Sequence, residues 1–293
     1  MKACDVVDRL RFVERQTLWT KEYEDSLAED EHDIYPGMMF MLAKERLEKS
    51  KLWKILRRMP KGALLHCHLE AMVDLDWLFE EVLETEGMCI LAEKGLSTER
   101  DRSTTPFFFD YTKERAAADV SIWTEEYKGN THVPVTAAAS DYPEDGRDGF
   151  KAWVKSRCII TPEESLKHHL GPNHIWRKFA STFDVLASAL FYEPIFRKFV
   201  RRMCQQLLDD GVQWVDLRSA FNIPYTRTGA EKPDEDFHEM IRVLGEEIDS
   251  FKASEEGKDF WGARVIWTTI RSFDTQGIIE RTSYFCTVLI HIH

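Results

Sequence analysis

Long apolar runs are absent from this sequence. No stretch reaches the roughly 18–20 apolar residues that a membrane-spanning helix needs, and Met1–Arg15 is charged, without an apolar run of signal-peptide length. A basic excess is absent too, because 39 lysines and arginines stand against 51 aspartates and glutamates, for a net charge of -12. General binders of nucleic acid or anionic membranes need a basic face, so we expect neither class. Read literally, the sequence predicts a soluble cytoplasmic protein.

Closely spaced cysteines and nucleotide-binding glycine motifs are also missing. The absence of any C-x-x-C pair argues against a disulfide scaffold and against a zinc site built from cysteines. Without G-x-G-x-x-G or a P-loop, the sequence gives no support to a nucleotide-phosphate site. Spacing leaves open whether Cys89 and Cys158, which flank an irregular stretch, pair in an oxidising compartment. The six cysteines are Cys4, Cys67, Cys89, Cys158, Cys204 and Cys286.

Apolar residues are plentiful and periodic. With 43% hydrophobic and 12% aromatic residues among 293, the chain can bury the core of one large domain or of two small ones. The spacing predicts short strands that alternate with helices, which is typical of a parallel sheet with right-handed crossovers. Three strands cannot close a barrel, so they are either the first three of eight or part of an open sheet. The expected strands are Ala63–His68, Val212–Ser219 and Arg264–Thr269, and the expected helices are Met38–Arg58, Asp74–Glu86, Pro162–His169, Trp176–Leu190, Pro194–Asp210 and Pro233–Phe251.

One motif carries chemistry. Residues two apart on a strand face the same way, roughly 6.6 Å apart along the chain, so His66 and His68 point together while Cys67 points away. Two such imidazoles can bind one Zn²⁺, and the C-terminal end of a barrel strand is where barrel active sites lie. His291 and His293 repeat the spacing, but nothing follows them to build a site, and we interpret them as tail. His68-Leu69-Glu70 fits half of the cytidine-deaminase signature, whose P-C-x-x-C half is absent.

Met59–Ala71 resembles the opening motif of the adenosine deaminases, specifically their adenosine-deaminase-related growth factor branch. Supporting segments lie within Trp176–Met203, Val215–Arg218 and Val265–Asp274, so the resemblance covers most of residues 38–275. It implies the N-terminal part of a (β/α)8 TIM-type barrel, preceded by a helical extension and carrying an insertion after the first strand. The expected boundaries are 1–58 for the helical region, 59–275 for the partial barrel, about 87–162 for the insertion, and 276–293 for a divergent tail.

The resemblance also implies a reaction. A zinc-dependent hydrolase of this family converts adenosine or deoxyadenosine to inosine or its deoxy form, and the metal lowers the pKa of water so that hydroxide exists near neutral pH. Carried over by position, His66 and His68 are Zn²⁺ ligands, Glu70 contacts the ribose, and Trp176 and Phe179 lie near the purine nucleoside. An alternative role for Trp176 is packing in a core between helices. Members of this branch are often secreted, which is the alternative to a cytoplasmic location.

The sequence departs from the family pattern. The His-Ala-Gly-Glu motif, which supplies a third zinc ligand and the general acid, has no match, and neither do the later catalytic histidine and zinc-binding aspartate. We therefore expect a chain that stops before the barrel is complete and is inactive alone. The alternatives are a non-catalytic remnant that binds or forms a homodimer through its helical region, and another amidohydrolase that opens with His-x-His.

Overall fold

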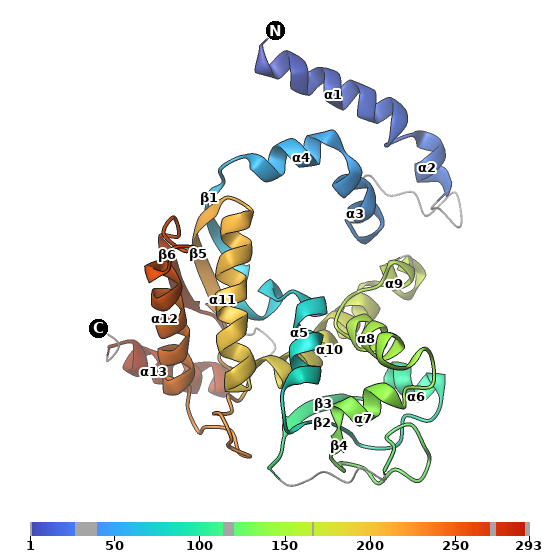
Figure 1. Cartoon of the computed structure of the whole chain (residues 1–293), viewed down its shortest axis with the longest axis vertical. Coiled ribbons are helices and arrows are strands. Elements are labelled where there is room, and N and C mark those ends of the chain that lie inside the picture. Colours follow the sequence, from blue (N-terminus) through green and yellow to red (C-terminus); the bar gives the residue numbers. More distant parts are fainter. Residues whose placement is uncertain (1, 27–39, 114–119, 166, 270–273, 291–293) are drawn as a thin grey trace. The chain divides into compact units, whose positions relative to one another are not determined.

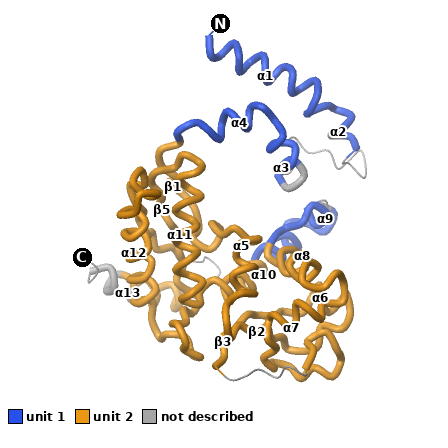
Figure 2. Tube along the Cα trace, viewed as in Figure 1, with its two compact units in different colours: residues 1–60, 159–180 blue, residues 61–158, 181–293 orange. Residues whose placement is uncertain are grey.

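The computed structural model describes residues 2–26, 40–113, 120–165, 167–269 and 274–290. They form two compact units, coloured separately in Figure 2. The first comprises Met1–Pro60 and Ile159–Ala180, and the second comprises Lys61–Cys158 and Ser181–His293. Each unit is described by itself below.

The first unit is helical, and the single helix that the sequence predicted over residues 38–58 is interrupted in the structure. Instead of one helix over residues 38–58, the described part has two, because the Ser50 side chain accepts a hydrogen bond from the Trp53 N–H and so caps a new helix. Residues 38 and 39 lie outside the described ranges. The unit contains α1 (Ala3–Thr17), α2 (Lys21–Ser26), α3 (Phe40–Lys49), α4 (Lys51–Arg58), α9 (Pro162–Ser165), the short 3-10 turn η2 (His168–Leu170) and the beginning of α10 (Pro172–Leu190).

The second unit is built around a parallel sheet of the strands β1 (Gly62–His68), β5 (Val212–Ser219) and β6 (Gly262–Trp267), in the order β1-β5-β6. The predicted parallel α/β arrangement is therefore confirmed. Helices α11 (Glu193–Asp209) and α12 (His238–Ala253) cover one face of this sheet (Figure 1). Val215 and Leu217 of β5 are completely buried beneath them, so this face forms the core.

Most predicted elements of this unit agree with the structure within a few residues. Helix α5 (Leu75–Glu84) begins after Asp74, whose carboxylate accepts a hydrogen bond from the Trp77 N–H. Helix α12 begins at His238 rather than at Pro233, because the Asp234 N–H is already hydrogen-bonded to the Tyr225 carbonyl in the preceding loop. Helix α13 (Thr275–Ile290) follows β6, whereas His291 and His293 lie outside the described residues.

Between β1 and α11 the chain forms a second, antiparallel sheet of β2 (Met88–Ala92), β3 (Phe107–Tyr111) and β4 (Val133–Pro134), in the order β3-β2-β4. Helices α6 (Glu99–Thr104), α7 (Val135–Ser140) and α8 (Gly146–Arg157) accompany it. Its core is aromatic, with Phe107 stacked on Trp153 at 4.4 Å between ring centroids. Cys89 and Cys158 are both buried, and no disulfide joins them, so the pairing that spacing left open is not formed.

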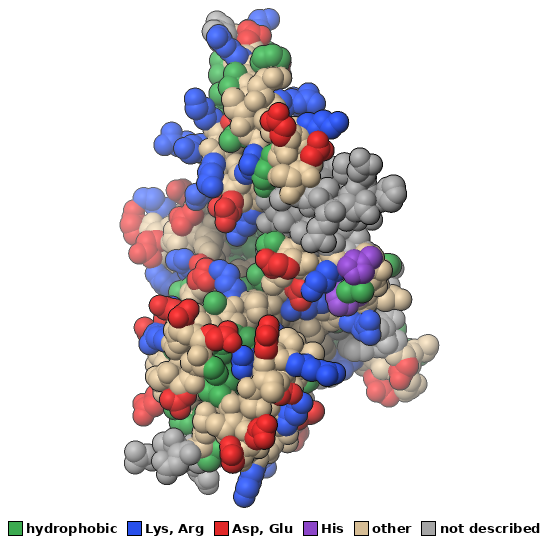
Figure 3. Space-filling model, turned by 90° about the vertical axis from the view of Figure 1, so that its right-hand side faces the viewer, with side chains coloured by type: hydrophobic (Ala, Val, Ile, Leu, Met, Phe, Trp, Pro, Cys, Tyr) green, Lys and Arg blue, Asp and Glu red, His purple; other side chains and the backbone are tan. Residues whose placement is uncertain are grey.

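The surface carries charges of both signs. On the face drawn in Figure 3, Lys and Arg side chains alternate with Asp and Glu side chains, and neither sign forms a continuous patch. Among the helices within the described ranges, none combines the length and the apolar character needed to cross a bilayer.

Candidate active site

The two histidines of the His-x-His motif end strand β1. Their rings lie side by side, with centroids 5.7 Å apart and planes inclined by 49°. Both side chains are exposed. Cys67 between them turns away and donates a hydrogen bond to the Asp216 carbonyl at 3.5 Å, as the alternation of a strand requires.

Strand pairing tells which face of the sheet the histidines occupy. His68 is opposite Arg218 in the parallel register, and Cys67 is opposite the buried Leu217. The pairing shifts between Leu64 and Cys67, which is where a bulge re-aims neighbouring side chains. The histidines therefore lie on the face opposite to the one that α11 and α12 cover.

This same face carries a charged pair. Asp216 of β5 is opposite Arg264 of β6, whose guanidinium donates to the Asp216 carboxylate at 2.6 Å. The Trp214 indole donates a second hydrogen bond at 2.9 Å. Together these bonds hold the pKa of the Asp216 carboxyl below its usual range. Asp216 is therefore an anionic side chain that already has its partners.

Glu70 follows β1 in a 3-10 turn (Leu69–Met72, η1) and is buried. Burial raises the pKa of its carboxyl group, and a hydrogen bond from the Ser219 hydroxyl at 3.2 Å works in the opposite direction. Ser219 ends β5, so adjacent parallel strands bring the pair together at their C-terminal edge. Sequence reasoning missed Ser219, although its position at the end of the second strand was a usable signal.

The separation of the two imidazole rings can be compared with the separation that a shared Zn²⁺ requires. With Zn–N distances of about 2.0–2.1 Å, two imidazole ring centres that share one tetrahedral Zn²⁺ lie roughly 5 Å apart. The separation of 5.7 Å between the His66 and His68 rings is close to this value. Within the part of the chain that the structure describes, no cluster of three or more His, Cys, Asp or Glu side chains is arranged to hold a metal ion. The residues present thus fit two positions of a site that usually needs three protein ligands.

The other two predicted substrate residues lie on α10. Trp176 and Phe179 are 63% and 41% exposed, with ring centroids 5.6 Å apart. Both belong to the first unit, whereas Glu70 and the two histidines belong to the second. Their exposure shows that they are not part of a buried helix-packing core within the first unit.

Comparison with known proteins gives the family context. No protein-family model matches the chain. It is 25% identical to adenosine deaminase 2-A of Danio rerio over 251 residues, which is 84% of this chain and 44% of that protein. It is 26% identical to adenosine deaminase 2 of Homo sapiens over 247 residues (84% and 43%), and 26% identical to adenosine deaminase of Phlebotomus duboscqi over 249 residues (85% and 43%).

The matched region runs through most of the chain but less than half of each of these relatives. The aligned length of 247–251 residues is similar to that of the resemblance seen in the sequence alone. The resemblance is therefore confirmed: over most of its length the chain is similar to adenosine deaminases, among them several adenosine deaminase 2 proteins.

Proposed function

We propose that this chain forms the first part of the zinc site of an adenosine deaminase barrel, whose reaction is hydrolytic deamination of adenosine or deoxyadenosine. The observation that carries the proposal is the adjacent pair of exposed imidazoles at the C-terminal end of β1, 5.7 Å apart. Their place at the C-terminal end of a parallel strand supports it, because α/β barrel enzymes build their sites at this end of the strands.

His66 and His68 would hold the metal through neutral imidazole nitrogens. When bound, Zn²⁺ would lower the pKa of water enough to supply hydroxide near neutral pH. Glu70 would accept a hydrogen bond from a ribose hydroxyl, and the Ser219 hydroxyl would fix the orientation of its carboxylate. Trp176 and Phe179 would contact the purine ring.

A deaminase needs further groups than these. General-acid catalysis in this family falls to the glutamate of a His-Ala-Gly-Glu motif, which this sequence does not contain. We therefore propose that the 293-residue chain does not turn over adenosine by itself, and that activity appears only where later barrel strands supply the missing ligands.

The experiment compares the chain with a chimera in which it replaces the aligned region of human adenosine deaminase 2. Conversion of adenosine to inosine is followed with and without added Zn²⁺. The bare chain should show no turnover, whereas an active chimera should lose at least about a hundredfold in rate when His68→Ala removes a ligand. An active chimera that tolerates the loss of both histidines, or turnover by the bare chain, contradicts the proposal.

A second candidate function is non-catalytic self-association through the first unit. Three apolar side chains of α1 are exposed, namely Val6, Phe12 and Val13, at 41%, 66% and 47%. Packing these residues against a second copy would remove them from water. Light scattering after size exclusion tests this: a dimer that dissociates in Phe12→Lys, but not in a control such as Glu48→Lys, supports it. A monomeric wild type refutes it.

A further inference from the structure

A cavity of about 380 Å³ lies within the second unit, apart from the histidine pair. It is bounded by β3, the last turns of α10, Tyr192 at the start of α11 and the loop after β5. Figure 1 shows these segments near one another. None of His66, His68 or Glu70 lines it. Its volume falls in the range of about 300–1,000 Å³ typical of small-molecule sites.

The polar groups that line the cavity from the described residues are anionic or neutral. Two carboxylates line it, from Asp110 and Asp184, and none of the lining residues within the described ranges is Lys, Arg or His. Asp110 already has a partner, because His132 Nε2 lies 2.9 Å from its Oδ2. Neither the Asp184 carboxylate nor the Asn222 carboxamide makes a side-chain hydrogen bond or ion pair to any residue in the described ranges. Both groups are therefore available to a ligand.

The walls of the cavity are aromatic. The Tyr111 and Tyr192 rings stack with centroids 4.8 Å apart and planes inclined by only 15°. Phe108 is 37% exposed and also lines the space. Aromatic faces attract both flat apolar groups and cations. A cation that carries an aromatic ring could therefore contact both a carboxylate and aromatic side chains in this cavity.

The loop that closes the cavity is held in place by hydrogen bonds. Glu231 accepts one from the Thr112 hydroxyl at 3.0 Å and one from the Lys113 N–H at 2.8 Å, which tie the loop to the end of β3. The Gly229 N–H donates to the Tyr192 hydroxyl at 3.2 Å. A cavity whose walls are fixed in this way loses little entropy when a ligand enters.

We propose that this cavity is a binding site for a small organic ammonium ion that carries an aromatic ring. The ammonium group pairs with the Asp184 carboxylate, and the ring lies against Phe108 and the stacked tyrosines. The Asn222 carboxamide accepts or donates one further hydrogen bond. The site is independent of the proposed deaminase chemistry, since it shares none of the residues assigned there.

The probe is 2-phenylethylamine, which is protonated at pH 7, and its matched neutral analogue is 2-phenylethanol. Saturation-transfer NMR and calorimetric titration are carried out on the full 293-residue chain. The amine should bind measurably at millimolar concentration and the alcohol at least about tenfold more weakly, because a charge-assisted hydrogen bond is lost. Equal binding of the two probes, or no binding of the amine to folded protein, overturns the proposal.

Two variants locate the site. Asp184→Asn keeps the size of the side chain and should weaken amine binding about tenfold or more. Asn222→Ala should weaken it less. The control is Asp209→Asn, which removes an exposed charge of α11 that does not line the cavity. If Asp184→Asn and Asp209→Asn reduce the affinity equally, the effect is net charge rather than a site, and the proposal fails. Circular dichroism confirms that each variant is folded.

Discussion

At the scale of single residues, two buried tyrosine hydroxyls differ in whether they have hydrogen-bond partners among the described residues. The Tyr127 hydroxyl is fully used, since it accepts from the Ala92 N–H at 3.1 Å and donates to the Thr131 carbonyl at 2.7 Å. The Tyr225 hydroxyl is buried without a partner among the described residues, and so is the Trp267 indole nitrogen. Burial raises the pKa of both tyrosines. Only the first hydroxyl stabilises the fold through hydrogen bonds.

Removing each of these two hydroxyls should give different results. Tyr225→Phe should leave the free energy of unfolding unchanged or raise it by up to about 1 kcal/mol, because an unpaired buried hydroxyl is destabilising. Tyr127→Phe should lower it by about 1–3 kcal/mol, because it leaves buried backbone groups unpaired. Urea denaturation measures both variants. A comparable loss in the two would show that Tyr225 has a partner of its own.

The sequence alone predicted that the His66 and His68 side chains lie side by side, because the alternation of side chains along a strand depends only on neighbouring residues. It did not predict the partner of Glu70, because Ser219 is separated from it by 149 positions and is brought near only by strand pairing. It also did not predict the cavity beside Tyr111 and Tyr192, which forms from segments distant in sequence. Contacts of this kind depend on register and packing, which periodicity does not specify.

At the scale of elements, the start of α4 explains why one predicted helix became two. The first two backbone N–H groups of α4 donate hydrogen bonds to a side chain of another helix. The Glu14 carboxylate of α1 accepts from the Lys51 N–H at 2.6 Å and from the Leu52 N–H at 3.3 Å. Ser50 accepts the next one, from Trp53. The apolar stripe runs through this boundary, so helical periodicity could not reveal it.

Glu14→Ala should therefore loosen the start of α4. We expect a loss of about 0.5–2 kcal/mol in local stability, the usual effect of removing an N-terminal cap. Faster hydrogen exchange at the Lys51 and Leu52 amides is the direct readout. Glu48→Ala, an exposed position on α3, is the control. Unchanged exchange at Lys51 and Leu52 would contradict the capping role of Glu14.

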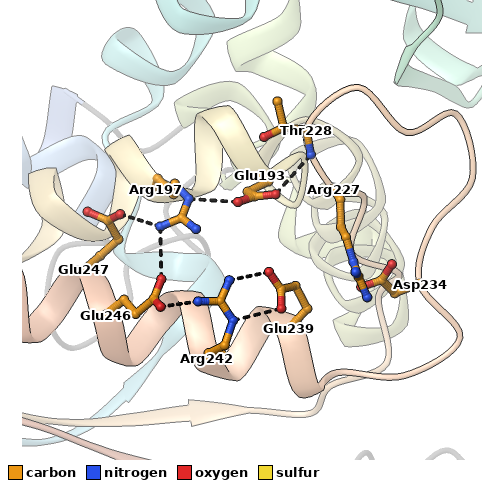
Figure 4. A network of polar contacts seen from close by, with 9 residues as sticks. All are labelled: Glu193, Arg197, Arg227, Thr228, Asp234, Glu239, Arg242, Glu246 and Glu247. Carbon is orange, nitrogen blue, oxygen red and sulfur yellow. Dashed lines mark hydrogen bonds and ion pairs between the residues drawn. The ribbon is translucent and has the colours of Figure 1, made fainter.

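Helices α11 and α12 are joined by a network of ion pairs (Figure 4). Arg197 of α11 contacts Glu193 and Glu247 at 2.8 Å each and Glu246 at 3.5 Å. Arg242 of α12 then links Glu246 to Glu239. Several charges linked in this way stabilise more reliably than an isolated surface pair, and salt weakens the effect.

The network has a pH signature. Hydrogen bonds from Arg242 hold the pKa of Glu239 below its ordinary value of 4.5. A carboxyl with a lowered folded-state pKa stabilises the fold fully above its unfolded-state pKa, and this contribution disappears as the pH falls through the folded-state value. Glu239→Gln should thus be less stable than wild type at pH 7, and the difference should shrink below about pH 4. Thermal melts across this range measure it. A difference that persists at pH 2 would refute the assignment.

At the scale of the whole molecule, the two faces of the parallel sheet in the second unit differ: α11 and α12 pack on one, and the exposed His66 and His68 lie on the other. The covered face is a packed core, whereas the other carries His66, His68 and the Asp216–Arg264 pair. The chain spans less than half the length of the relatives it matches. The sequence predicted the order of strands and helices. The proposal of a partial barrel rests on the resemblance and on the polar side chains that lie on the sheet face opposite α11 and α12.

The most direct test of the account is a zinc titration followed through the histidine side chains by two-dimensional ¹H–¹⁵N NMR. The account predicts that the imidazole signals of His66 and His68 shift together and saturate at one Zn²⁺ per chain, while those of His132 and His238 stay in place. It also predicts that His66→Ala abolishes the shift of His68. Signals of His66 and His68 that remain unmoved, or that respond no more than the other histidines, would contradict a shared metal site at the end of β1.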